Sequence, residues 1–112
     1  MKIAFTAVGT TWDSQIDSRF GRTEFIVILN EETQQLEVID NSAVKNEAHG
    51  AGTATAQKMY ELKPDVLITG NGPGDTAATA LKNLNMKIFV DAHNLTLEQA
   101  YNSYKNGSLK QL

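Results

Sequence analysis

Short apolar runs alternate with segments of helical spacing through the second half of the chain, and this alternation constrains the fold more than any other feature. Residues 65–69 and 86–90 are typical of buried β-strands. The segments that follow them predict helices, because Ala77, Leu81 and Leu84 share one face and Thr96 begins a capping-box pattern. Strands joined through helices are parallel, with right-handed crossovers, which predicts a sheet covered by helices.

The first half of the chain predicts the remaining strands. Residues 2–8 are short and mostly apolar, and residues 24–30 and 36–40 are separated by a polar turn typical of an antiparallel hairpin. A helix is expected to begin near Gly50 and to end before Pro64. The predicted order is βββαβαβα. It describes a three-layer α/β/α fold with a five-stranded mixed sheet in which the second strand alone is antiparallel.

Length and composition favour a small globular protein. The 112 residues are 41% hydrophobic and 21% charged, so we expect a single domain over residues 1–112. The longest wholly apolar run, residues 25–29, is far shorter than the about 20 residues of a membrane span, and the start lacks the pattern of a signal peptide. We therefore expect a cytoplasmic protein that does not bind membranes.

Charge and cysteine content exclude several kinds of site. The net charge of −3 does not provide the basic surface that nonspecific nucleic-acid binding requires. Cysteine is absent, which excludes disulfides, thiolate zinc sites and iron–sulfur clusters built from cysteine. Any metal cluster bound by this chain must therefore be held by other groups.

The predicted strand directions collect most of the unusual residues at one edge of the sheet. Ligands of open α/β sheets bind outside the carboxyl ends of the strands, and two predicted helices begin near Gly50 and Asp75 at that edge. Helix N-termini and arginines favour anions, and glycines allow close approach to the main chain. We thus predict a cleft for a compact anionic ligand. Its candidate binding residues are Arg19, Phe20, Gly21, Arg22, His49, Gly50, Gly52, Gly70, Asn71 and Gly72, with His49 as the candidate metal ligand. Phe20 has a second interpretation, in which it pins the loop into the core.

Each of these features also has a structural interpretation. Arg19 and Arg22 are placed to pair with Asp13, Asp17 or Glu24, and glycines at the ends of strands are needed for turns alone. His49 beside a helix start is more often a hydrogen-bond partner than a ligand. Trp12 either packs the long loop at residues 9–23 onto the core or stays exposed for a protein partner. The sequence leaves these alternatives open.

Patterns expected of an enzyme are weak. There is no G-x-S-x-G motif, and no spacing ties the serines and histidines into a triad. Two-metal chemistry requires carboxylates gathered at strand ends, and only Asp40, Asp75 and Asp91 could approach one another there. We therefore expect a non-catalytic protein. The alternatives are an enzyme acting on a phosphorylated or nucleotide ligand in the same cleft and a protein-interaction adaptor.

Several short motifs, taken in order, resemble one protein family over about residues 2 to 109. They are Met1-Lys2-Ile3-Ala4, Arg19-Phe20-Gly21-Arg22, Asp40-Asn41, His49-Gly50-Ala51-Gly52, Thr69-Gly70-Asn71-Gly72-Pro73-Gly74, Thr96-Leu97-Glu98-Gln99-Ala100 and Gly107-Ser108-Leu109. The chain resembles the dinitrogenase iron–molybdenum cofactor biosynthesis family, which includes small nitrogenase-cofactor carriers and orange-protein-like members. It departs from many relatives at Arg19, where they carry histidine.

This resemblance implies a ribonuclease H-like fold and a function related to nitrogen fixation. The family's expected activity is to bind or carry an anionic metal–sulfur cluster that contains molybdenum with iron or copper. The expected partners are the metallocluster or its precursor and a cofactor-assembly protein. By resemblance, the loop at Phe20 and Gly21, the motif from His49 to Gly52 and the loop from Gly70 to Gly74 line the cleft, and His49 contacts the metal.

Overall fold

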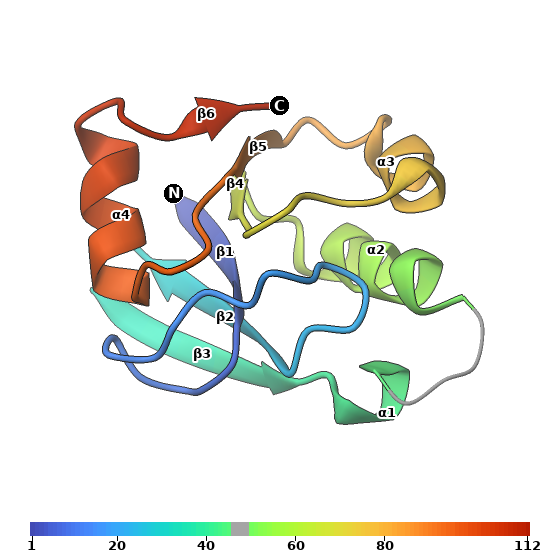
Figure 1. Cartoon of the computed structure of the whole chain (residues 1–112), viewed down its shortest axis with the longest axis horizontal. Helices are drawn as coiled ribbons and strands as arrows, with labels where there is room; N and C mark the ends of the chain where they lie inside the picture. Colours follow the sequence, from blue (N-terminus) through green and yellow to red (C-terminus); the bar gives the residue numbers. More distant parts are fainter. Residues whose placement is uncertain (46–49) are drawn as a thin grey trace.

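The computed structural model describes residues 1–45 and 50–112, which form one mixed β-sheet flanked by helices (Figure 1). The strands are β1 (Lys2–Ala7), β2 (Phe25–Asn30), β3 (Gln35–Asp40), β4 (Val66–Ile68), β5 (Lys87–Val90) and β6 (Lys110–Gln111). The helices are α1 (Ser42–Lys45), α2 (Ala51–Leu62), α3 (Asp75–Leu81) and α4 (Leu97–Lys105).

The sheet has the order β3-β2-β1-β4-β5-β6. β2 runs antiparallel to both β1 and β3, whereas β4 and β5 run parallel to β1. The predicted α/β class, the mixed sheet and the antiparallel second strand are therefore confirmed. The carboxyl ends of β1, β4 and β5 meet at one edge, as the alternation of strands and helices requires.

The predicted number of elements was wrong in two places. A sixth strand, β6, pairs antiparallel with β5, so β2 is not the only antiparallel strand. The two residues of β6 are polar and exposed, and such a strand leaves no hydrophobic pattern to detect. The four-residue helix α1 follows β3 directly, and the predicted order contains no helix there.

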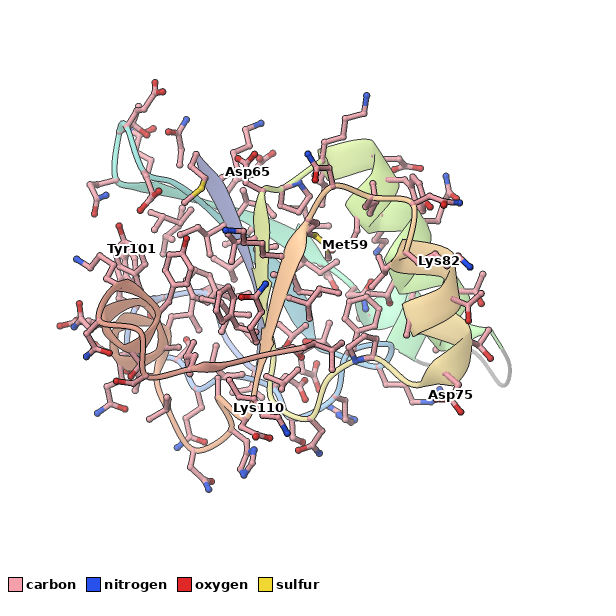
Figure 2. The ribbon with its side chains drawn as sticks, turned by 90° about the horizontal axis from the view of Figure 1, so that it is seen from above. Met59, Asp65, Asp75, Lys82, Tyr101 and Lys110 are labelled. Carbon is pink, nitrogen blue, oxygen red and sulfur yellow. The ribbon has the colours of Figure 1, made fainter. Side chains whose placement is uncertain are left out.

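Helices cover both faces of the sheet and enclose two hydrophobic clusters. Met59 of α2 and Leu81 of α3 pack on one face against β1, β2 and β4. Leu97 and Tyr101 of α4 pack on the other face, and Figure 2 shows Met59 and Tyr101 on opposite sides of the sheet. The predicted three layers are therefore present. None of the helices in the described part of the chain is long and apolar enough to span a bilayer.

The long loop between β1 and β2 is closely packed against the body of the protein. The Ile16 N–H donates to the Leu95 carbonyl at 2.8 Å, and the Glu98 N–H donates to the Trp12 carbonyl at 3.1 Å. The Trp12 ring lies 6.4 Å from the Phe5 ring and 5.8 Å from the Tyr101 ring, measured between centroids. Trp12 thus anchors the loop to α4, which favours its structural interpretation over an exposed docking role.

Candidate functional site

A cavity of about 520 Å³ lies at the edge of the sheet where the parallel strands end. This volume is within the range of small-molecule sites. The loop before β2 and the starts of α2 and α3 surround it. Its lining residues are Arg19, Gly21, Arg22, Gly50, Ala51, Gly52, Thr53 and Thr76.

The N-terminus of α2 forms one wall of this cavity. Gly50 precedes the helix in the left-handed conformation, with φ of 78°, and as a glycine it supplies no side-chain cap. The N–H groups in the first turn of a helix have no partner within the helix, and the helix dipole adds partial positive charge there. Ala51, Gly52 and Thr53 of this turn all line the cavity. The wall is suited to an anion.

Main-chain atoms approach each other closely beside this wall. A Cβ atom added to Gly21 would lie 2.7 Å from the Gly52 nitrogen and 2.8 Å from its Cα, so only glycine fits there. A Cβ at Gly52 would lie 3.3 Å from the Ala77 Cβ, where α2 packs on α3. Figure 1 shows the loop between β1 and β2 running beside α2. Gly21 therefore lets the loop contact the start of α2, and Gly52 lets α3 pack closely on the same turn.

Three polar side chains fix the loop in this position. The Thr55 hydroxyl donates to the Gly21 carbonyl at 2.8 Å, and the buried Asn41 amide donates to the Thr23 carbonyl at 3.1 Å. The Lys58 ammonium donates to the Asn41 side-chain oxygen at 2.6 Å. Because Asn41 and Thr55 are fully buried, these bonds are protected from water. The position of Gly21 is therefore set from behind the cavity wall.

Arg19 is held by a buried carboxylate. Its Nε donates to Asp17 Oδ1 at 3.1 Å, and its Nη2 donates to Asp17 Oδ2 at 3.2 Å. The same Nη2 lies 4.0 Å from Glu24 Oε1. The structural interpretation of Arg19, pairing with Asp17 and Glu24, is therefore confirmed. Part of its charge is neutralised before any ligand arrives.

Asp17 stays ionised in this environment. Burial by itself raises the pKa of Asp17, but hydrogen bonds from the Arg19 side chain and from the Arg19 and Glu24 main-chain N–H groups lower it. The net result is a pKa below the ordinary value of 3.8. The same pairing raises the pKa of Arg19. The loop is consequently organised around a fixed negative charge behind the cavity.

Half of the predicted site residues line the cavity. Of the ten candidates, Arg19, Gly21, Arg22, Gly50 and Gly52 line the cavity. Phe20 is only 3% exposed and packs in the core beneath α2 and α3 instead. His49 lies outside the described residues, and so does its predicted metal contact.

The loop from Gly70 to Gly72 is at the same edge but, within the described chain, is not part of the cavity lining. The Gly70 and Asn71 N–H groups donate to the Asp17 and Ser18 carbonyls at 3.3 and 2.9 Å. Gly72 has φ of 84° and packs beside Val90. These contacts support the loop that carries Arg19, and a role of Gly70, Asn71 and Gly72 in ligand binding stays a prediction.

Two lining residues, Thr53 and Thr76, were not predicted, and Ala51 was expected only as part of the motif from His49 to Gly52. Ala51 and Thr53 belong to the first turn of α2, and Thr76 belongs to the first turn of α3. The predicted helix starts could have identified these residues. The first turn of each helix lies at the edge of the sheet to which its N-terminus points, so its side chains are near the cavity. Thr53 and Thr76 carry neither a charge nor the conformational freedom of glycine, so no other sequence feature marks them.

Metal ligands are not gathered in the described part of the chain. No group of three or more His, Asp or Glu side chains there is placed to hold a metal ion. Asp40, Asp75 and Asp91 therefore do not form a common metal site, as two-metal hydrolysis would require. Asp40 instead accepts a hydrogen bond from the Ser42 N–H at 2.8 Å. The cavity chemistry is that of hydrogen bonding and charge.

Comparison with known proteins gives consistent matches over nearly the whole chain. The sequence profile of the family described as "Dinitrogenase iron-molybdenum cofactor" matches residues 1–107. The apo form of the orange protein from Desulfovibrio gigas is 34% identical, with a TM-score of 0.92 over 99% of this chain and 92% of that one. A candidate NifB protein from Thermotoga, placed in the DUF35 family, is 27% identical, with a TM-score of 0.82 over the same shares. Curated protein sequences give no significant match.

Proposed function

The chain belongs to the dinitrogenase iron–molybdenum cofactor family, and from this premise we propose that it binds and carries an anionic metal–sulfur cluster without catalysing a reaction. The observation that carries this proposal is the open N-terminus of α2, which lines a cavity together with Arg22. Main-chain N–H groups and a guanidinium donate hydrogen bonds to anions and supply compensating positive charge.

The lining residues fit a cluster that brings its own sulfur ligands. A chain without cysteine supplies no thiolate, so metal–sulfur bonds must already be present in the ligand. Sulfide on the outside of such a cluster accepts hydrogen bonds from N–H groups. Gly50 leaves the helix start open to a bulky ligand, because it has no side chain there and, in the described chain, no atom beyond its chain neighbours lies within 4 Å of an added Cβ. We propose molybdenum with iron or copper as the metals of this cargo.

The relatives support the same class of ligand. The family name refers to the iron–molybdenum cofactor, and the orange protein was solved in its apo form, a term for a protein without its bound group. A carrier would exchange its cargo with a cofactor-assembly protein, which we propose as the macromolecular partner. The resemblance also implies a ribonuclease H-like fold. We propose this fold for the chain, and the strand order supports it.

Reconstitution without oxygen tests this function. The purified chain is mixed with tetrathiomolybdate and either ferrous or cuprous ions, desalted, and examined by elemental analysis and visible absorption. We expect retained molybdenum in a fixed ratio to protein and an absorption band that free thiomolybdate does not show. A colourless protein that retains no metal would contradict the proposal.

Two variants locate the bound cluster. Arg22→Ala removes a lining guanidinium, and we expect it to weaken binding by about tenfold, the size of one charge-assisted hydrogen bond. Gly21→Ser puts a side chain against Gly52 and should weaken binding at least as much. Asp13→Asn is the control, since Asp13 is exposed and is not among the residues that line the cavity. Equal binding by all three variants would place the ligand elsewhere.

A phosphorylated small molecule is the second candidate ligand, because helix N-termini and arginines bind phosphate equally well. Adding inorganic phosphate or a nucleotide to the reconstituted protein distinguishes the two. Displacement of the cluster by micromolar nucleotide would favour this candidate. We expect displacement only at millimolar concentrations, where any competing anion occupies the cavity.

A further inference from the structure

The two outer strands of the sheet are protected to very different degrees. β6 and β3 form the opposite edges of the sheet, as Figure 1 shows. β6 has only two residues, whereas β3 has six. β3 pairs with β2 in continuous register from Gln35 to Asp40, and its sequence holds no proline or lysine. Soluble proteins commonly shield an edge strand with such residues or by keeping it short. β3 is therefore able to accept another strand.

The direction of each backbone group on β3 follows from its pairing. The Asn41 N–H donates to the Glu24 carbonyl at 3.0 Å, and these two residues are directly opposite in the register that pairs Asp40 with Phe25. Hydrogen-bonded and non-hydrogen-bonded pairs alternate along an antiparallel ladder. Glu37 and Ile39 therefore direct their N–H and carbonyl groups toward β2. Leu36 and Val38 direct theirs away from the sheet.

The side chains of β3 alternate in the same way. Leu36 packs against the cluster beneath α4, and Val38, on the same face of the strand, is 41% exposed. Glu37 and Ile39 are on the other face, where Ile39 packs toward α2 and α3 and Glu37 is exposed. An added strand would thus lie beside a valine on one face and a carboxylate on the other.

We propose that β3 docks an extended segment of a partner protein in which basic residues alternate with β-branched ones. Its backbone would pair with the outward groups of Leu36 and Val38, and its basic side chains would lie on the face that carries Glu37. This is strand addition, with main-chain bonds giving affinity and alternate side chains giving specificity. A second copy of this chain fits less well, since it would add its own Glu37 and Asp40 with no basic residue on either strand.

Nuclear magnetic resonance on the full-length ¹⁵N-labelled chain tests this interface. The probe is a synthetic peptide of alternating lysine and valine with blocked ends. In the free protein, the amide protons of Leu36 and Val38 should exchange rapidly with solvent, while those of Glu37 and Ile39 are protected. Saturating peptide should slow exchange at Leu36 and Val38 by at least about tenfold, as expected for new backbone hydrogen bonds. Unchanged exchange at both residues would overturn the proposal.

A proline variant separates strand addition from simple charge attraction. Val38→Pro removes an outward N–H and leaves the bonds to β2 in place, which an edge strand tolerates. We expect it to weaken peptide binding by about tenfold or more, whereas the control Val38→Thr, which keeps the N–H, should bind within about threefold of the parent. Glu37→Lys should reverse the preference toward a peptide of alternating glutamate and valine.

Two further outcomes would refute the assignment. Equal binding by Val38→Pro, with its folded spectrum intact, would mean that the peptide only adsorbs through charge. Concentration-dependent dimerisation of the parent that Val38→Pro abolishes would assign the edge to a second copy instead. This inference is independent of the proposed cluster binding, because β3 contributes no residue to the lining of the cavity.

Discussion

At the scale of single residues, Asp17 organises more of the site than any residue that lines it. Its carboxylate is 3% exposed and accepts bonds from the Arg19 guanidinium and from the Arg19 and Glu24 N–H groups. Its carbonyl accepts from the Thr6 hydroxyl at 3.0 Å and from the Gly70 N–H at 3.3 Å. One residue therefore joins the loop to β1 and to the segment that follows β4.

Asp17→Asn should lower the free energy of unfolding by about 1.5–3 kcal/mol near pH 7, the range for hydrogen bonds to a charged group. Because the pKa of Asp17 is lower in the folded state, its contribution is present above the ordinary value of 3.8 and is lost as pH falls through the lowered pKa. Urea denaturation at several pH values measures this. The difference between parent and variant should shrink below pH about 4, and a constant difference would contradict the assignment.

Asp13→Asn serves as the control for that measurement. Asp13 is in the same loop and is exposed, so its replacement should change stability by less than about 0.5 kcal/mol. A similar loss in both variants would indicate a general effect of loop charge.

Gly21→Ser tests the close approach of the loop to α2 as a stability effect. A Cβ 2.7 Å from the Gly52 nitrogen must displace main-chain atoms, and we expect a loss of about 1–3 kcal/mol. Gly74→Ser should be neutral or slightly stabilising, because serine is a good N-cap for α3 and meets no neighbour. Thermal denaturation measures the melting temperatures of the two variants. Equal melting temperatures would show that the loop can move away from α2 without loss of stability.

At the scale of secondary-structure elements, the sequence predicted those that carry a hydrophobic pattern. The capping box at Thr96 forms as predicted, with the Gln99 N–H donating to the Thr96 hydroxyl at 3.2 Å and the Thr96 N–H donating to Gln99 Oε1 at 3.0 Å. β6 and α1 carry no such pattern. They form because neighbouring elements offer them partners, as when the Leu112 N–H donates to the Ile88 carbonyl at 2.8 Å.

The candidate site was predictable only to the level of the sheet edge. Strand direction correctly brought Arg22, Gly50 and Gly52 together at that edge. The sequence could not distinguish a glycine that opens a cavity from one that lets two loops touch. Gly70 is of the second kind, because its neighbours are the main-chain atoms of Asp17 and Ser18. That difference depends on contacts between segments far apart in the chain.

Trp12→Ala should release the loop between β1 and β2 from α4. The ring packs between Phe5 and Tyr101, so we expect a loss of about 2–4 kcal/mol in the free energy of unfolding. Val8→Ala, at an exposed position of the same loop, should change it by less than about 0.5 kcal/mol. Urea denaturation followed by tyrosine fluorescence or circular dichroism measures both. A loss below about 1 kcal/mol for Trp12→Ala would contradict the anchoring role.

At the scale of the whole molecule, ligand binding and folding are linked. The cavity is formed by the loop before β2 and by two helix starts, which come together only in the folded chain. A ligand that binds this state alone adds about 2.7 kcal/mol to the free energy of unfolding at one hundred times its Kd.

Saturating tetrathiomolybdate with copper should therefore raise the melting temperature by roughly 10 °C or more for a domain of this size. Differential scanning calorimetry without oxygen measures the shift. Arg22→Ala should reduce it, while Asp13→Asn should not. If the cluster leaves the melting temperature unchanged at every concentration, it does not bind the folded chain in preference to the unfolded one.

The wall at the start of α2 is made of peptide groups, and this has a consequence for how the protein could change during evolution. A peptide N–H is present for every amino acid except proline, so most substitutions leave the donors in place. Only glycine fits at position 21, so selection can alter this surface chiefly at Gly50 and Gly52. Homologues with different clusters are therefore expected to keep the glycine at position 21 and to differ first at the other two positions.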